Sequence, residues 1–76
     1  MSITIDARKR QERVAYNANH LEEYHGYAPP GSTTAAAVWA ISKSTYTAEM
    51  LLDKVQWANT GSDNNKWTER LTYTYN

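Results

Sequence analysis

A Pro-Pro-Gly corner divides the middle of the chain into two alternating segments. Residues 21–28, before the corner, alternate in side-chain type as an extended strand does. Pro29 and Pro30 lack amide donors and fix φ near about −65°, and Gly31 can supply the positive φ of a chain reversal. Residues 38–45, after the corner, alternate between a bulky row with Trp39 and Ile41 and a row of small residues. The pattern predicts two strands joined through a reversal.

The second half of the chain continues in the same way. Thr47, Ala48 and Glu49 suit a turn, and residues 50–58 alternate as a further strand. The polar loop 59–65 follows, and Leu71 to Asn76 alternate as a last strand. β-Branched and aromatic residues dominate this half. We therefore expect a mainly β fold, a small antiparallel sheet of four or five strands, and we find no obvious internal repeat.

The N-terminal part has a different pattern. Ile3 and Ile5 alternate with polar residues, which indicates a short strand or an extended arm. Asp6 can cap a helix, and a thin apolar stripe at spacings of three and four follows it, so we expect a helix that ends near Asn17 to Asn19. The predicted organisation is an N-terminal arm or helix over residues 1–19 and a small β domain over residues 20–76.

Four of the eight basic residues fall close together in this N-terminal part: Arg8, Lys9, Arg10 and Arg13. Such a cluster can contact nucleic acid or an acidic partner, or it can be a solvated helix face. We favour the solvated face, since no aromatic lies among these residues and eight acidic residues balance the chain's charge. Nucleic acid is therefore not the expected partner.

The chain's size and lack of cysteine point to assembly. A domain of 76 residues buries a limited share of its surface, and small folds are often supported by disulfides, a metal or oligomerisation. With no cysteine and only His20 and His25, disulfides are excluded and neither a metal nor a cofactor is expected. We expect a homo-oligomer. The sequence has no apolar run of membrane-spanning length and no signal-peptide core, so we expect no membrane partner and synthesis in the cytoplasm.

Nothing in the sequence predicts an enzyme. No Gly-x-Ser-x-Gly elbow frames a serine, and no glycine-rich phosphate loop is present. Glu22 and Glu23 are adjacent on a predicted strand, so their side chains face opposite ways and cannot flank one substrate.

The aromatic residues are the best candidates for binding. All of them are Trp or Tyr, which combine apolar area with a polar end and are enriched in binding hot spots. We expect Trp39 and Trp57 in the core, because their strands also carry Ile41 and Val55. The interface candidates come from the two ends of the chain: Ile3, Ile5, Trp67, Tyr73 and Tyr75.

Four motifs in order carry a family resemblance. They are Tyr-x-Gly-x-Ala-Pro-Pro-Gly from Tyr24, Trp-x-Ile from Trp39, Val-Gln-Trp-Ala-Asn from Val55, and Trp-x-x-Arg-x-x-x-Thr-Tyr from Trp67. In this order they resemble a group of small tailed-bacteriophage virion structural proteins. The resemblance implies a non-enzymatic component of the virion, in the tail or elsewhere in the particle, that assembles with other virion proteins after synthesis in the host cytoplasm. An alternative is a host-surface or glycan-binding module on the virion exterior, and a third is a small DNA-contacting protein.

Overall fold

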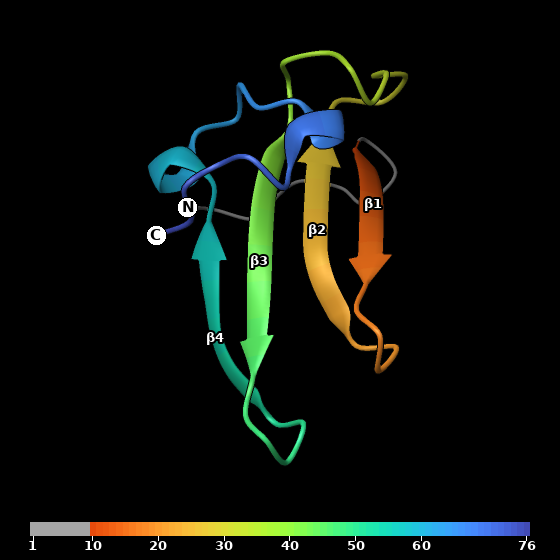
Figure 1. Ribbon diagram of the computed structural model, residues 1–76. Helices are drawn as coiled ribbons and strands as arrows, with labels where there is room; N and C mark the ends of the chain where they lie inside the picture. Colours follow the sequence, from red (N-terminus) through yellow and green to blue (C-terminus); the bar gives the residue numbers. More distant parts are fainter. Residues whose placement is uncertain (1–9) are drawn as a thin grey trace.

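The protein is a four-stranded antiparallel sheet in a computed structural model that describes residues 10–76 (Figure 1). The strands are β1 (Gln11–Tyr16), β2 (Glu22–Ala28), β3 (Ala40–Tyr46) and β4 (Leu52–Trp57). Each pairs with the next in the chain, in the order β1-β2-β3-β4. The expected mainly β fold is therefore confirmed, and the Pro-Pro-Gly corner lies in the long connection between β2 and β3.

Residues 11–16 form a strand, whereas the sequence led us to expect a helix there. Val14 pairs with His25 and Ala15 with Tyr24, so the backbone of this segment is hydrogen-bonded to β2. A short isolated helix is marginal in water, and pairing with β2 is therefore the more stable choice. β-Branched and aromatic residues such as Val14 and Tyr16 also suit a strand. The expected boundary between residues 19 and 20 falls in the turn between β1 and β2. The arm residues before Arg10, including Ile3 and Ile5, lie outside the described part of the chain.

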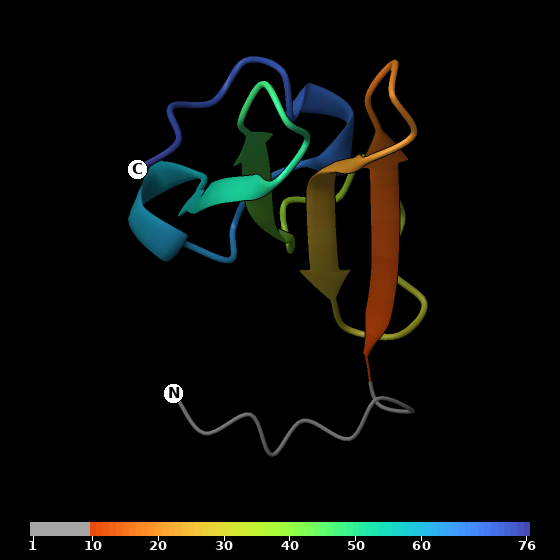
Figure 2. The same ribbon diagram turned by 90° about the horizontal axis from the view of Figure 1, so that it is seen from below.

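The C-terminal residues do not form the expected last strand. Short 3₁₀ turns, η2 (Asn59–Gly61) and η3 (Trp67–Glu69), follow β4. The chain then runs over one face of the sheet (Figure 2), and beside the end of β4 it forms an isolated β-bridge between Ala58 and Tyr75 instead of a strand. The Leu71–Asn76 alternation therefore belongs to an irregular segment that covers the sheet.

The core lies on this covered face. Trp39 and Ile41 are fully buried, and Tyr24 and Trp67 nearly so. The rings of Trp39 and Trp67 lie 5.9 Å apart and pack over Gly26, where an added Cβ would come within 2.9 Å of both. Only glycine leaves room for the two indoles. Burial of Trp39 confirms one expected core residue.

Asn65 joins the polar loop to this core. Its backbone exchanges hydrogen bonds with that of Trp39, at 2.9 and 3.1 Å, and its buried side-chain amide donates to the Trp39 carbonyl at 3.0 Å. The amide oxygen accepts from Asn59 Nδ2 at 2.6 Å. A buried amide is costly unless hydrogen-bonded, and these bonds fix the loop against the start of β3.

Trp57 departs from the expected core position. Its partner Ser42 pairs with His25, which alternates with the buried Tyr24 and Gly26. Trp57 therefore lies on the sheet's opposite face, here called the open face, and is 36% exposed.

Candidate functional site

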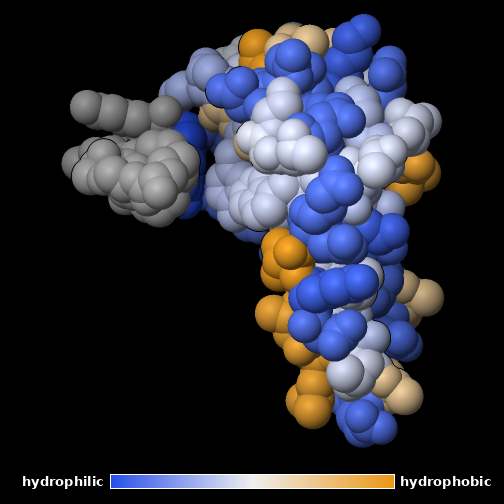
Figure 3. Space-filling view, turned by 90° about the vertical axis from the view of Figure 1, so that its left-hand side faces the viewer, coloured by the Kyte–Doolittle hydropathy of each residue, from blue (hydrophilic) through white to orange (hydrophobic). Residues whose placement is uncertain are grey.

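The β3–β4 hairpin projects beyond the rest of the described molecule (Figure 1). In the space-filling view from the β4 side, apolar side chains gather along this projecting part (Figure 3). We define the apolar hairpin surface by its exposed large side chains, which are Met50, Leu51, Leu52, Val55 and Trp57. Exposed apolar side chains that are contiguous, rather than scattered, are typical of interaction sites.

Strand geometry explains why two of these residues are exposed together. Val55 is opposite Ser44, and Trp57 is opposite Ser42. Both therefore project from the open face beside small, buried serines. Small side chains on β3 leave the larger ones on β4 uncovered by neighbours on that strand. The sheet therefore presents apolar area here instead of burying it.

The outer edge of β4 is the second part of the site. Trp57 exchanges two backbone hydrogen bonds with Asn76, at 2.8 and 3.0 Å, and Asn59 donates to the Thr74 carbonyl at 2.9 Å. These bonds cover the upper end of the edge. Over Leu52–Gln56, β4 is the last strand of the sheet formed by residues 10–76. An edge strand of this kind is a template for pairing with another chain.

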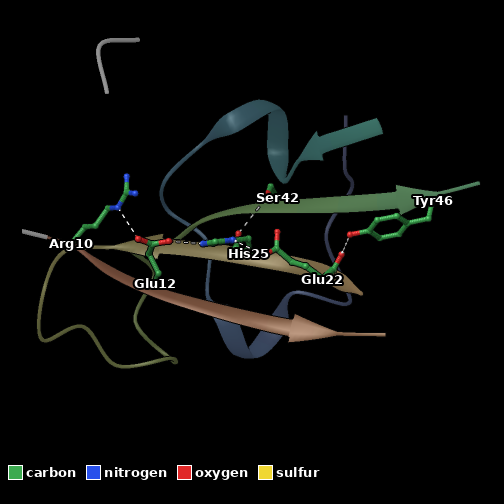
Figure 4. A network of polar contacts seen from close by, with 6 residues as sticks. All are labelled: Arg10, Glu12, Glu22, His25, Ser42 and Tyr46. Atoms are coloured by element: carbon green, nitrogen blue, oxygen red, sulfur yellow. Dashed lines mark hydrogen bonds and ion pairs between the residues drawn. The ribbon is translucent and has the colours of Figure 1, made fainter. Parts of the chain in front are cut away.

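A polar network occupies the part of the open face formed by β1 and β2 (Figure 4). His25 Nε2 lies 2.7 Å from a Glu12 carboxylate oxygen and His25 Nδ1 lies 3.0 Å from a Glu22 oxygen. Carboxylates only accept, so both contacts are hydrogen bonds when the imidazole carries two protons. The hydrogen bond from His25, with help from Arg10 at 3.0 Å, lowers the pKa of Glu12.

An aromatic row continues from this network toward β4. The rings of His25 and Tyr27 stack at 4.4 Å, and Tyr27 lies 6.1 Å from Trp57. The Arg10 guanidinium lies 5.1 Å from the Tyr27 ring centroid. Partial burial raises the pKa of Tyr27, and the nearby Glu12 carboxylate adds to this effect. The row is partly exposed and suits contact with another surface.

The interface candidates that lie within residues 10–76 are placed mostly inward. Trp67 is 6% exposed and packs in the core. Tyr73 and Tyr75 are half-buried against it. The Tyr73 hydroxyl oxygen accepts from the Lys66 amide at 2.7 Å, and the Tyr75 hydroxyl donates to the Arg70 carbonyl at 2.7 Å. These rings therefore hold the C-terminal segment on the sheet.

Sequence reasoning missed the apolar hairpin surface. It assigned residues 50–58 to a strand and treated the alternation as evidence for burial. The signal that could have found the site is the run Met50-Leu51-Leu52 directly after a turn, since three consecutive large apolar residues cannot all face one side of a strand.

Residues 10–76 contain no group of three or more His, Cys, Asp or Glu side chains placed to hold a metal ion. They also contain no helix with the length and apolar character that a bilayer crossing requires. Comparison with known protein families, curated proteins and solved structures returned no match.

Proposed function

We propose that this chain is a non-enzymatic structural component of a tailed-bacteriophage particle that acts by oligomeric assembly with other virion proteins. The observation that carries the assembly role is the apolar hairpin surface, which lies on a projecting hairpin beside the free part of the β4 edge. Burying such side chains against a partner gains roughly 25 cal/mol for each Å² removed from water. The order of the four sequence motifs supports the phage assignment.

The test of this proposal uses the tip of the hairpin. The double variant Met50→Ser and Leu51→Ser removes apolar area at exposed positions, so the sheet should stay folded. Incorporation into particles should fall by roughly tenfold, which corresponds to about 1.4 kcal/mol. The matched control is Leu71→Ser, at a position that is 75% exposed but lies on the C-terminal segment. Co-sedimentation with purified particles is the readout. Full incorporation of the double variant would remove the assembly role of the hairpin.

The N-terminal arm has its own place in the proposal. Since β1 begins at Gln11, deletion of Met1 to Asp6 leaves every described strand intact. We expect that this deletion leaves the sheet folded and weakens assembly, through loss of Ile3 and Ile5.

A specific observation favours one alternative function. The aromatic row of His25, Tyr27 and Trp57 lies next to the carboxylates of Glu12 and Glu22, and a sugar ring can stack on an aromatic face while its hydroxyls bond to carboxylates. This arrangement would suit a host-surface or glycan-binding module. A glycan array that shows binding lost in Trp57→Ala, together with normal particle incorporation, would favour this function.

A further inference from the structure

The two hairpins of the sheet are versions of one unit. Residues 13–28 align with residues 43–58 at an offset of 30, which matches Tyr16 with Tyr46, Ala18 with Ala48, Leu21 with Leu51 and Ala28 with Ala58. Arg13 and Lys43, Glu23 and Asp53, and Tyr27 and Trp57 are similar pairs. Because the two segments share few identical residues, the sequence alone does not make the repeat obvious.

The backbone confirms the equivalence at the turns. Asn17 N donates to Leu21 O at 2.8 Å in the first turn, and Thr47 N donates to Leu51 O at 2.8 Å in the second. His20 and Met50, at matching positions, have φ of 63° and 64°. The register is irregular between residues 15 and 16 of β1, and between residues 45 and 46 of β3. Both hairpins therefore have the same geometry.

The structure also shows how one unit docks on the next. The second strand of the first hairpin, β2, pairs with the first strand of the second hairpin, β3. The Tyr46 hydroxyl closes this junction by donating to the Glu22 carbonyl at 2.6 Å (Figure 4). At the offset of 30, the counterpart of Tyr46 is Tyr16 on β1 and the counterpart of Glu22 is Leu52 on β4.

These counterparts are at the two outer edges of the sheet. Tyr16 is 65% exposed, and within residues 10–76 its hydroxyl makes no bond like that of Tyr46. Leu52 is 59% exposed and begins the free part of the β4 edge. One molecule thus carries both halves of the junction contact on surfaces that cannot meet each other within the described sheet.

We infer that the chain binds a second copy of itself head to tail, with β1 of one copy continuing the sheet next to β4 of the other. This deepens the proposed function and rests on it, since it names the partner used in assembly. The register follows from the internal junction, in which Tyr24 is opposite Lys43 and His25 is opposite Ser42. By the same offset Lys54 is opposite Arg13 of the second copy, and Val55 is opposite its Glu12.

The hydrogen-bonding direction of β4 agrees with this register. Trp57 bonds outward to Asn76, and backbone groups alternate along a strand, so the groups of Val55 also face outward. The contact ends at Gln56, because Asn76 occupies the outer side of Trp57. A head-to-tail contact of this kind builds a ring or an open chain of copies.

The register brings like charges together, which provides the test. Arg13 and Lys54 repel across the contact, so Lys54→Glu should tighten self-association about two- to fivefold, as should Arg13→Glu. The double variant, with two glutamates opposed, should return to the wild-type value. Sedimentation equilibrium of the full chain measures this. Lys66→Glu makes the same charge change outside β1 and β4 and should have no such effect.

The hydroxyl contact gives a second measurement. Tyr16→Phe should weaken self-association roughly fivefold, as expected for one lost hydrogen bond, and should leave the denaturation midpoint unchanged. Tyr46→Phe is the matched control, because it removes the junction bond inside one chain and should lower the midpoint instead.

Disulfide trapping can detect the contact even if the two copies associate weakly. The chain has no cysteine, and a pair that is not hydrogen-bonded brings Cα atoms within about 4.5 Å, close enough for a disulfide. A mixture of Arg13→Cys and Lys54→Cys proteins should form cross-linked heterodimers in excess of either protein alone. No excess over a mixture with Leu71→Cys, or single charge reversals without effect, would overturn the head-to-tail contact. If particle incorporation still depended on Met50 and Leu51, the proposed function would stand without it.

Discussion

Two tryptophans, Trp39 just before β3 and Trp57 at the end of β4, have opposite environments. Trp39 is fully buried, and its indole Nε1 donates to the Thr33 carbonyl at 3.0 Å. Trp57 lies on the open face, next to Tyr27, with 36% of its surface exposed. The sequence predicts that both lie in the core, because each shares one face of an alternating segment with an aliphatic residue, Ile41 for Trp39 and Val55 for Trp57. Alternation defines two faces of a strand but does not say which face is covered.

This difference predicts unequal costs of truncation. Trp39→Ala should lower the free energy of unfolding by roughly 3–5 kcal/mol, because it leaves a cavity against Trp67 and Gly26. Trp57→Ala should cost less than about half as much, since water can replace a ring that is already partly exposed. Chemical denaturation of the two variants checks this. Equal losses would mean that the open face is covered when the protein is folded.

At the scale of elements, β2, β3 and β4 were predictable within one or two residues, and β1 was not. Residues 22–28 and 40–46 alternate clearly on either side of the Pro-Pro-Gly corner. Residues 11–16 carry charged side chains around Val14, and the spacing of the apolar residues predicted a thin amphipathic helix there. Pairing with β2 decides between the two structures, and the local sequence does not contain that information. The apolar hairpin surface was missed for a similar reason, since Val55 is exposed because no element within residues 10–76 covers its face.

The equivalent turns predict equivalent responses to glycine. His20 and Met50 hold φ of 63° and 64°, a conformation that is unfavourable for residues with a Cβ. His20→Gly and Met50→Gly should each raise the free energy of unfolding by about 0.5–1 kcal/mol, after the entropy of glycine in the unfolded chain is subtracted. Ala48→Gly, in the same turn but without a positive φ, should be destabilising. Thermal denaturation of the three variants is the measurement. A gain in only one of the two turns would show that the hairpins differ in strain.

At the scale of the whole molecule, the C-terminal segment has two roles. It covers the core face, where Tyr75 lies 5.7 Å from Tyr24, and its last residues bond to the upper edge of β4. The Lys43 ammonium lies 5.8 Å from the Tyr24 ring centroid and 5.9 Å from that of Tyr75, so it spans both aromatic rings. Covering part of one edge limits the length of strand that another chain can use, a common protection of edge strands. The segment thus completes the core and restricts assembly to the lower part of β4.

The docking of this segment should depend on alkaline pH through Tyr75. Burial, reinforced by Tyr24 and Tyr73, raises the pKa of Tyr75 from 10.0 to about 12. The folded state therefore favours the neutral phenol, whose hydroxyl donates to the Arg70 carbonyl at 2.7 Å. A group with a raised folded pKa contributes stability that is complete below the unfolded pKa, near 10, and is lost as the pH rises toward 12.

We therefore expect the free energy of unfolding to fall between pH 10 and about 12, with a shallower fall in Tyr75→Phe. At neutral pH the variant should be less stable by about 1 kcal/mol, because it lacks the hydrogen bond to Arg70. Urea denaturation at a series of pH values, with phenolate absorbance followed in parallel, separates the two effects. Tyr27→Phe removes the other tyrosine whose pKa is raised by burial and measures the share of the slope that arises on the open face. A slope in Tyr75→Phe as steep as in the wild type would show that the C-terminal segment does not hold this phenol away from water.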